Sequence, residues 1–255
     1  MKTILQCGYG TIGKRMYPDY TKLGDVTVFD PYVKVSELNF YTDFNLLKSK
    51  HFDFAILCLP TPTVDGKCDC SIVKEMAIKI KDMVDIIIVR STVYVGFMRE
   101  LLKEVPNAVF FPEFYGVTQH QAVNDFAILC GNRKLTKKVA QLFYAVKPAS
   151  FKVKYYEDPT VGEMIKYMCN CYLATKVVFC NSIAAACDKM GIEYDDVREG
   201  WLLDSRVNPS HSIVYDDHHY YDSHCFNKDV PAFANQFNDA FLKAVDDINN
   251  SRRNK

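Results

Sequence analysis

The first 157 residues alternate short apolar runs with helical patterns, and this alternation constrains the fold more than any other feature. Several runs are apolar almost without interruption, which is typical of parallel strands buried on both faces of a sheet. Between the runs, apolar residues recur at helical spacing, most clearly from Ile72 to Met83. The alternation predicts an α/β domain with a doubly wound sheet. The predicted strands are Thr3–Cys7, Val26–Asp30, Phe54–Pro60, Ile86–Thr92, Val109–Phe114, Ala127–Gly131 and Phe151–Tyr156.

A change of pattern at Asp158 and Pro159 predicts the start of a long helix. Asp158 suits the N-cap of a helix, and Pro159 suits its first turn. Apart from Gly162, no glycine or proline follows before Gly191, which is a suitable residue for the helix end. The predicted helix has about 30 residues, which is long for a globular domain.

The chain after this helix is predicted to form a small helical domain. Its expected parts are a short helix at Asp195–Trp201, an irregular stretch over residues 204–224 and a last helical pattern after Asp229. We therefore expect two domains, residues 1–157 and residues 158–255, and the second begins with the long helix.

Charge and composition indicate an ordinary soluble protein. The 255 residues include 31 basic and 31 acidic side chains, which give a formal net charge of zero, and 49% are hydrophobic. This balance argues against nucleic acid or a membrane surface as a partner. No apolar run approaches the roughly 18 residues that a membrane span needs. The first residues lack the pattern of a signal peptide, so we expect a cytoplasmic protein.

The chain contains ten cysteines, which could form disulfides, bind a metal or remain as buried thiols. Most of them lie in apolar runs, where a thiol acts as a small hydrophobe. Two closer pairs, Cys68 with Cys70 and Cys169 with Cys171, lack the usual spacing of zinc ligands. We therefore predict reduced thiols in a reducing compartment and no metal.

A glycine-rich turn, Gly8-Tyr9-Gly10-Thr11-Ile12-Gly13, directly follows the first predicted strand. In a dinucleotide fold such glycines allow a tight turn and a close approach of the backbone to a pyrophosphate, which lies at the helix N-terminus. Asp30 ends the second predicted strand, where a carboxylate would bind the ribose hydroxyls and repel the 2′-phosphate of NADP. The pattern predicts a Rossmann-like domain that binds NAD through Gly8, Gly10, Thr11, Ile12, Gly13 and Asp30. The alternative is an ordinary glycine-rich turn followed by a capping aspartate.

Polar residues also follow three later strands. Thr61, Thr92 and Glu113 lie in the segments Leu59–Pro62, Arg90–Val93 and Phe111–Phe114. In open α/β sheets, ligands bind beyond the carboxyl ends of the strands. These side chains are candidates for lining a site, with Thr61 and Thr92 near the cofactor, although each segment alone could be a turn.

Two further candidates lie in the second half of the chain. On the long helix, Glu163, Lys166 and Asn170 have spacings of three and four residues, which suit either one polar site or a solvated stripe with an ion pair. Cys225 lies in the polar segment Ser223–Asp229, outside any apolar run. A thiol in such surroundings is a candidate nucleophile, although a single cysteine is more often structural.

Taken together, these segments resemble the UDP-glucose 6-dehydrogenase family, which belongs with the UDP-N-acetylmannosamine and GDP-mannose dehydrogenases. The resemblance extends from Gly8 to Asp229, with many short motifs in the order of the family. The matching segments are Gly8–Gly13, Pro60–Pro62 with Asp65–Asp69, Ser91–Val93, Pro112–Phe114, Glu163–Lys166, Asn170, Leu173–Lys176, Asp195–Gly200, Pro209–His211, Cys225–Phe226 and Lys228–Asp229.

The resemblance implies an NAD-dependent four-electron oxidation of a nucleotide sugar, with UDP-glucose converted to UDP-glucuronate. Two NAD⁺ act in succession, and the thiolate of Cys225 carries a thiohemiacetal and then a thioester. By the same resemblance, Lys166 and Asn170 stabilise the oxyanion, which suits a cation and an amide. Asp229 orients or activates water together with Lys166, and Thr92 and Glu113 line the site.

The chain also departs from the family pattern. Residues 216–224, before Cys225, contain no glycine, whereas the family has a glycine-rich loop there. Family members continue into a second Rossmann-like domain that holds much of the nucleotide, and this chain ends about 25 residues after Asp229, so we expect a truncated relative. We also expect a homodimer through the long helix. Further apolar surface is expected on a single last helix that carries Phe233, Phe237, Phe241, Leu242 and Val245.

Two other interpretations remain open. A two-electron dehydrogenase of the hydroxyacid type also carries a lysine and an asparagine on a comparable helix, and it needs no cysteine. A catalytically silent NAD-binding remnant of the family would explain the lost glycines.

Overall fold

The computed structural model describes residues 1–33, 35–36, 38–114 and 126–254, and the chain divides into two compact units. Among the described residues, unit 1 comprises residues 1–62, 69–114 and 126–166, apart from residues 34 and 37. Unit 2 comprises residues 63–68 and 167–254.

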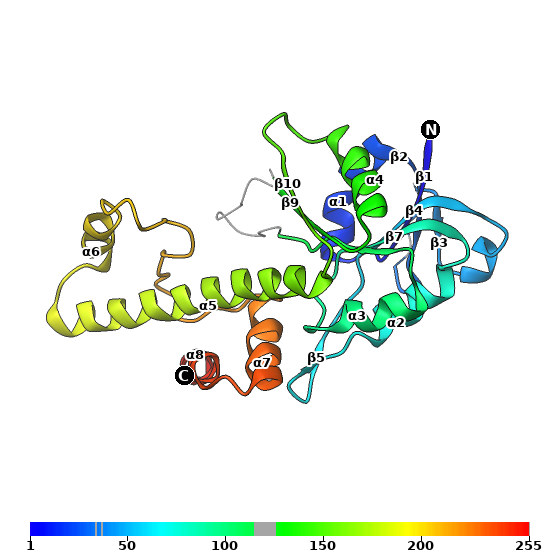
Figure 1. The fold of residues 1–255 in the computed structure, drawn as a ribbon. Helices are drawn as coiled ribbons and strands as arrows, with labels where there is room; N and C mark the ends of the chain where they lie inside the picture. Colours follow the sequence, from blue (N-terminus) through cyan, green and yellow to red (C-terminus); the bar gives the residue numbers. More distant parts are fainter. Residues whose placement is uncertain (34, 37, 115–125, 255) are drawn as a thin grey trace. The chain divides into compact units, whose positions relative to one another are not determined.

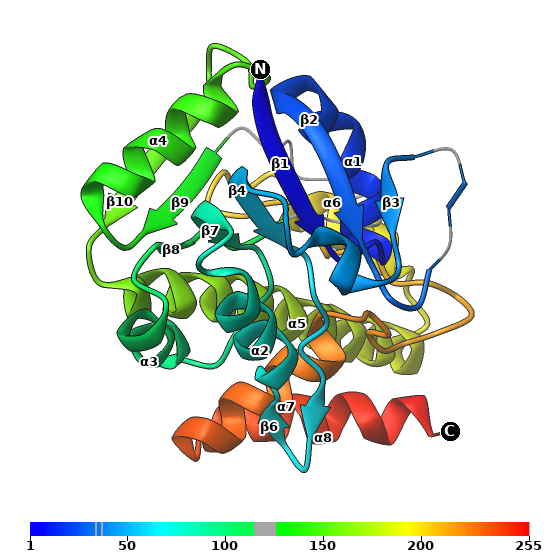
Figure 2. The same cartoon turned by 90° about the vertical axis from the view of Figure 1, so that its right-hand side faces the viewer.

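Unit 1 contains a sheet of eight strands in the order β10-β9-β8-β7-β4-β1-β2-β3 (Figure 2). β9 runs antiparallel to β8, and every other neighbouring pair is parallel. The α/β fold class and all seven predicted strands are confirmed, whereas the short β3 was not predicted. The strands are β1 (Lys2–Cys7), β2 (Gly24–Phe29), β3 (Phe40–Tyr41), β4 (Phe52–Leu57), β7 (Val84–Val89), β8 (Ala108–Phe110), β9 (Phe126–Cys130) and β10 (Lys152–Tyr156).

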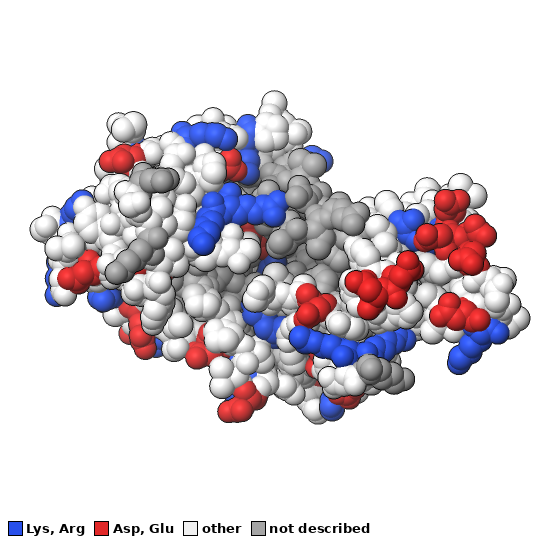
Figure 3. Space-filling view, turned by 180° about the vertical axis from the view of Figure 1, so that it is seen from behind, with Lys and Arg blue, Asp and Glu red and all other residues white. Residues whose placement is uncertain are grey.

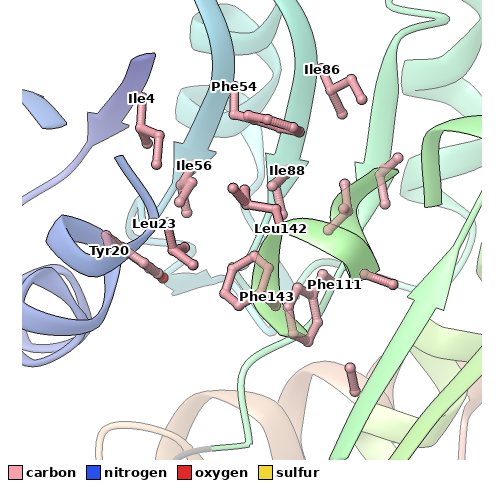
Figure 4. Packing of buried hydrophobic residues seen from close by; sticks show 14 of the residues in the cluster. Ile4, Tyr20, Leu23, Phe54, Ile56, Ile86, Ile88, Phe111, Leu142 and Phe143 are labelled. Atoms are coloured by element: carbon pink, nitrogen blue, oxygen red, sulfur yellow. The ribbon is translucent and has the colours of Figure 1, made fainter. Parts of the chain in front are cut away.

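Helices cover both faces of this sheet, with α1 and α4 on one side and α2 and α3 on the other (Figure 1). Their bounds are α1 (Thr11–Leu23), α2 (Ser71–Ile80), α3 (Phe97–Glu104) and α4 (Arg133–Tyr144), and a 3-10 turn, η1, covers Phe44–Leu47. The core under α1 and α4 is closely packed (Figure 4). In it, the rings of Tyr20 and Phe111 both meet Phe143 edge-on, at 6.3 and 5.0 Å between centroids.

The long helix, α5, covers Pro159–Met190 and has 32 residues, so it extends over about 48 Å at 1.5 Å per residue. The carboxylate of Asp158 accepts a hydrogen bond from Thr160 N at 3.0 Å, as an N-cap does. Gly191 follows the helix with φ +66°, in the left-handed region that favours glycine. The prediction of one long helix with these two ends is confirmed.

Unit 2 contains a hairpin and three further helices. The hairpin consists of β5 (Thr63–Val64) and β6 (Lys67–Cys68), and the helices are α6 (Tyr194–Trp201), α7 (Phe226–Phe237) and α8 (Ala240–Arg253). The hairpin, which was not predicted, is bonded to α7 at both ends. Thr63 Oγ1 donates to Lys228 O at 2.6 Å, and Asn235 Nδ2 donates to Gly66 O at 3.2 Å.

The prediction of a single last helix is wrong, because two helices occupy that segment. Asn238 lies between them with φ +50°, and Asp239 caps α8 by accepting from Leu242 N at 2.7 Å. The expected apolar surface is only partly exposed. Leu242 and Val245 are buried, whereas Phe237 and Phe241 are exposed.

Charged residues of both signs are interspersed on the face drawn in Figure 3, and acidic side chains gather around α6. Asp195 and Asp196 lie in the first turn of that helix. None of the helices that the structure describes is long and apolar enough to cross a membrane. Within the same residues, no group of three or more His, Cys, Asp and Glu side chains could hold a metal ion.

Candidate active site

The glycine-rich turn joins β1 to α1 as a dinucleotide-binding turn does. Gly8 has φ +96°, and a Cβ atom there would lie 2.3 Å from Cys58 O. A Cβ at Gly13 would lie 2.2 Å from Gly8 O, so only glycine fits at either position. At Gly10, by contrast, an added Cβ meets no described atom within 4 Å. The backbone is therefore open at Gly10, where a close approach to a pyrophosphate requires it.

The N-terminus of α1 provides the donors for such an anion. Its N-cap is Gly10, and no side chain caps the helix. The amides of Thr11, Ile12 and Gly13 in the first turn therefore have no capping acceptor among the described side chains. Free amides and the helix dipole together favour a phosphate at this point, so these residues fit NAD.

Asp30 holds the glycine-rich turn and retains capacity for a ligand. One of its carboxylate oxygens accepts from Tyr9 N at 2.8 Å, and the other accepts from Tyr32 N and Val33 N at 2.9 and 3.2 Å. A carboxylate has about four lone-pair positions, so about one remains for a ribose hydroxyl. The capping role that was an alternative in the sequence is thus present, and it does not exclude the cofactor role.

The polar residues after β4 and β7 are bonded to one another. Thr61 Oγ1 donates to Thr92 O at 2.6 Å. Ser91 Oγ donates to Leu59 O at 2.7 Å and accepts from Leu59 N at 3.1 Å. These bonds fix the two strand ends side by side. The hydroxyl of Thr61 therefore has a structural task in addition to the cofactor contact predicted for it.

Glu113 is buried and forms an ion pair with Arg90, whose Nη2 donates to Glu113 Oε2. The guanidinium lies 3.9 Å from the ring centroid of Phe111. Sequence reasoning missed Arg90, although a charged residue at the end of a buried apolar strand was the available signal. Because Arg90 binds its carboxylate, we expect Glu113 to act as a fixed acceptor that lines the site.

The polar stripe on α5 is buried. Glu163, Lys166 and Asn170 are 0%, 6% and 6% exposed, so the interpretation as a solvated stripe is wrong. The Glu163 carboxylate accepts from Gly96 N at 2.6 Å and from Met98 N at 2.8 Å, at the start of α3. Lys166 Nζ lies 5.1 Å from the ring centroid of Phe114. Lys166 and Asn170 are four residues apart, so they lie on the same face of α5.

In unit 2, Asp229 joins α5 to α7. It is 1% exposed, Asn170 Nδ2 donates to its Oδ2 at 2.6 Å, and Lys228 Nζ donates to its Oδ1 at 2.5 Å. Burial lowers the pKa of Lys228, but the adjacent Asp229 carboxylate outweighs this effect and holds that pKa above its usual value. The ammonium therefore stays charged, and it lies within electrostatic range of the thiols of Cys68 and Cys225.

Cys225 is the N-cap residue of α7 and is neither buried nor fully exposed. Asp229 N donates to Cys225 O at 2.9 Å, which places the two candidates one helical turn apart. The dipole at a helix N-terminus favours negative charge, and Lys228 adds a cation nearby. Unit 2 thus brings together Cys225, Asn170, Asp229 and Lys228, whereas the predicted cofactor residues, Thr92 and Glu113 belong to unit 1.

Comparison with known proteins identifies the family. Residues 26–124 match the NAD binding domain of the UDP-glucose/GDP-mannose dehydrogenase family, and residues 160–251 match its central domain. The chain belongs to this family. The predicted resemblance and the predicted cofactor, NAD, are confirmed by these two matches.

A relative agrees with this assignment, and solved structures share the fold. A UDP-glucose 6-dehydrogenase of Rickettsia prowazekii is 27% identical over 213 residues, which are 76% of this chain and 47% of the relative. A UDP-glucose dehydrogenase structure from Pyrobaculum islandicum matches 98% of this chain and 68% of its own, with a TM-score of 0.78 and 20% identity. A UDP-D-ManNAc dehydrogenase structure from Pyrococcus horikoshii matches 97% and 68%, with a TM-score of 0.79 and 18% identity. This family member thus spans about half the length of the curated relative, and the two structures support its fold.

Proposed function

We propose that this protein catalyses the NAD-dependent four-electron oxidation of a nucleotide sugar, UDP-glucose to UDP-glucuronate. The observation that carries the proposal is the buried Asp229, which accepts from Asn170 and from Lys228 beside Cys225. A thiol alone could be structural, but Asp229 lies one helical turn from Cys225 and binds an amide and an ammonium, a set that matches what covalent aldehyde oxidation needs. The name of the Rickettsia prowazekii relative supports UDP-glucose as the sugar nucleotide.

The residues divide the work of such a reaction. NAD⁺, when bound, accepts hydride at each of the two oxidation steps. After the first step, the Cys225 thiolate adds to the aldehyde carbon, and the carbonyl oxygen becomes an oxyanion that Lys166 and Asn170 stabilise. After the second step the carbon is held as a thioester, and water attacks it, releases the uronate and returns the thiol. Asp229 orients Asn170 and Lys228, and with Lys166 it directs the water.

For the cofactor, we propose that residues 1–157 form the NAD-binding domain and that residues 158–255 carry the nucleophile. Gly8, Gly10 and Gly13 shape the turn, and the free amides of the first turn of α1 hold the pyrophosphate. Asp30 binds the ribose, and Thr61 and Thr92 lie beside the cofactor. No disulfide joins any of the ten cysteines, all of which the structure describes, and we propose that the protein acts in the cytoplasm.

We further propose a homodimer through α5. Large apolar side chains that are 36–75% exposed follow one face of this helix, at intervals of three, four, four and seven residues. They are Val161, Met164, Met168, Tyr172 and Phe179. An exposed apolar stripe of this length is typical of a helix that packs against a second helix.

Steady-state turnover of the pure chain tests the reaction. Absorbance of the reduced cofactor is followed with UDP-glucose, GDP-mannose and UDP-N-acetylmannosamine in parallel. We expect two reduced cofactors per UDP-glucose and a uronate product. Cys225→Ser should abolish both the cofactor reduction and the uronate product. One reduced cofactor per substrate with Cys225→Ser unimpaired would instead establish the two-electron dehydrogenase. Binding of NAD⁺ without any turnover would establish the silent form.

A further inference from the structure

The segment before Cys225, residues 216–224, contains no glycine and is fixed to α8. Tyr221 N donates to Asn249 Oδ1 at 2.7 Å, and Asn249 Nδ2 donates to Tyr221 O at 3.1 Å. Asn249 is 0% exposed and Tyr221 is 4% exposed. The side-chain amide of Asn249 thus binds both backbone groups of one residue, as a neighbouring strand would.

Two other side chains of α8 contact the same segment. Tyr221 Oη donates to Asp246 Oδ1 at 3.1 Å, and Arg253 Nη2 lies 2.9 Å from Asp222 Oδ1. Asp246, Asn249 and Arg253 are spaced by three and four residues, so they share one face of α8. That face therefore holds Tyr221 and Asp222 at three points.

The next residues carry this constraint forward to the thiol. Asn227 Nδ2 donates to Asp222 Oδ1 at 2.7 Å, and Phe226 N donates to Ser223 Oγ at 3.0 Å. The ring of Phe226 also meets the ring of Tyr221 edge-on, with 5.7 Å between centroids. Cys225 lies between these fixed points, so its position at the start of α7 depends on where Tyr221 is held.

We propose that Asn249 is a positioning residue for Cys225. Its side chain is fully buried, and it acts through the backbone of Tyr221. The inference rests on the proposed role of Cys225 as nucleophile, but the geometry alone predicts that Asn249 controls how the thiol is presented. A pre-organised nucleophile reacts faster because its orientation is already set before the substrate binds.

The test compares Asn249→Ala with Ser251→Ala in the full chain. Ser251 is exposed on the same helix, and its hydroxyl donates only to Ile248 O. The first readout is the rate at which substoichiometric iodoacetamide alkylates Cys225, measured by mass spectrometry against the other nine thiols. The second is kcat and KM for UDP-glucose.

In Asn249→Ala we expect Cys225 to alkylate at least about threefold faster, because the freed segment exposes the thiol, while the other thiols are unchanged. We expect kcat to fall about tenfold or more with KM within a factor of two, and Ser251→Ala to match the unaltered protein. Unchanged Cys225 alkylation in Asn249→Ala would overturn the proposal. If the unaltered protein has no turnover, the proposed function fails. The alkylation comparison still decides whether Asn249 positions Cys225.

A second variant covers the case in which Asn249→Ala does not fold, seen as faster alkylation of all ten thiols. Asn249→Asp keeps the side-chain oxygen that accepts from Tyr221 N and removes only the donor to Tyr221 O. It should accelerate Cys225 alkylation about twofold and lower kcat by a similar factor. Alkylation and kcat equal to those of the unaltered protein would then overturn the proposal.

Discussion

Asn170 and Asp229 are 59 residues apart in the sequence, yet Asn170 Nδ2 donates to Asp229 Oδ2 at 2.6 Å, and both side chains are buried. The other oxygen of Asp229 accepts from Lys228 Nζ. Both carboxylate oxygens therefore have donors before any substrate binds. The carboxylate is placed to orient the amide and the ammonium. For Asp229 to act on water as predicted, one of its oxygens must bind the water in addition to its present donor.

Replacing Asp229 should damage both stability and turnover. In Asp229→Asn the Lys228 ammonium loses its counter-ion, and one acceptor oxygen remains where Asn170 and Lys228 had two. We expect a loss of about 2–3 kcal/mol in the free energy of unfolding. This is less than the cost of breaking a fully buried pair, because Lys228 is still 25% exposed. Turnover should fall at least about a hundredfold. Urea unfolding and steady-state kinetics measure the two effects.

The matched control is Asp247→Asn, which removes an exposed carboxylate that pairs with Lys243 on α8. An exposed pair of this kind contributes about 0.5 kcal/mol or less. Equal effects of the two substitutions would show that the bonds of Asp229 contribute no more to stability and turnover than an exposed ion pair does.

Two glycines of the same turn should respond in opposite ways to alanine. Gly8→Ala meets Cys58 O at 2.3 Å and must adopt φ +96°, so we expect a stability loss of about 2 kcal/mol or more. Gly10→Ala has open space and φ −76°, so the fold should keep its stability. The new methyl group lies where the pyrophosphate approaches, and NAD⁺ affinity should fall at least about tenfold. Thermal unfolding and calorimetric titration separate the two results, and unaltered NAD⁺ affinity in Gly10→Ala would place the cofactor elsewhere.

Asp30 should make the protein prefer NAD⁺ over NADP⁺ by at least about tenfold. A 2′-phosphate would lie against its carboxylate, and the repulsion of like charges at hydrogen-bond distance exceeds 1.4 kcal/mol, a factor of ten. Titration calorimetry with both cofactors measures the preference. Asp25→Ala, at an exposed position of the same strand, is the control and should leave the preference intact. Equal affinities in the unaltered protein would contradict the role of Asp30.

The strand–helix alternation was sufficient to predict the sheet and α5, because both depend on local apolar patterns and on end residues such as Asp158. The bonding of polar side chains was not predictable in this way. Spacing along α5 suggests that Glu163 pairs with Lys166, but its carboxylate accepts amides from Gly96 and Met98, far away in the sequence. The break at Asn238 was missed because apolar spacing continues across it, and a left-handed asparagine leaves only a weak local signal.

Acid should weaken the attachment between β1 and β4. Lys2 and the backbone amide of Thr3 both donate to Asp53, and they lower the pKa of that carboxyl to about 2. Since its pKa in the folded chain is below the usual value of about 3.9, its stabilisation is complete above that value. The stabilisation is lost as the pH falls through 2.

We expect Asp53→Asn to cost about 1 kcal/mol near pH 6, discounted because Lys2 is 56% exposed. The difference from the unaltered protein should disappear below pH 2. Urea unfolding across this range measures it. A difference in the free energy of unfolding that stays constant with pH would mean that the ionised Asp53 carboxylate is not the source of the stabilisation.

The apolar stripe on α5 should make the protein a dimer at micromolar concentration. Met168 and Tyr172, which are 75% and 62% exposed, lie one turn apart in the middle of the stripe. Burying such side chains stabilises a complex by about 25 cal/mol per Å² of apolar surface. The double substitution Met168→Glu with Tyr172→Glu places two charges in a surface that must lose its water, which costs several kcal/mol, so a monomer should result. Light scattering measures the mass.

Lys189→Glu, in the last turn of the same helix and outside the stripe, is the control and should leave the dimer intact. If the unaltered chain is already monomeric, or if the double variant remains a dimer, α5 is not the surface that joins two copies.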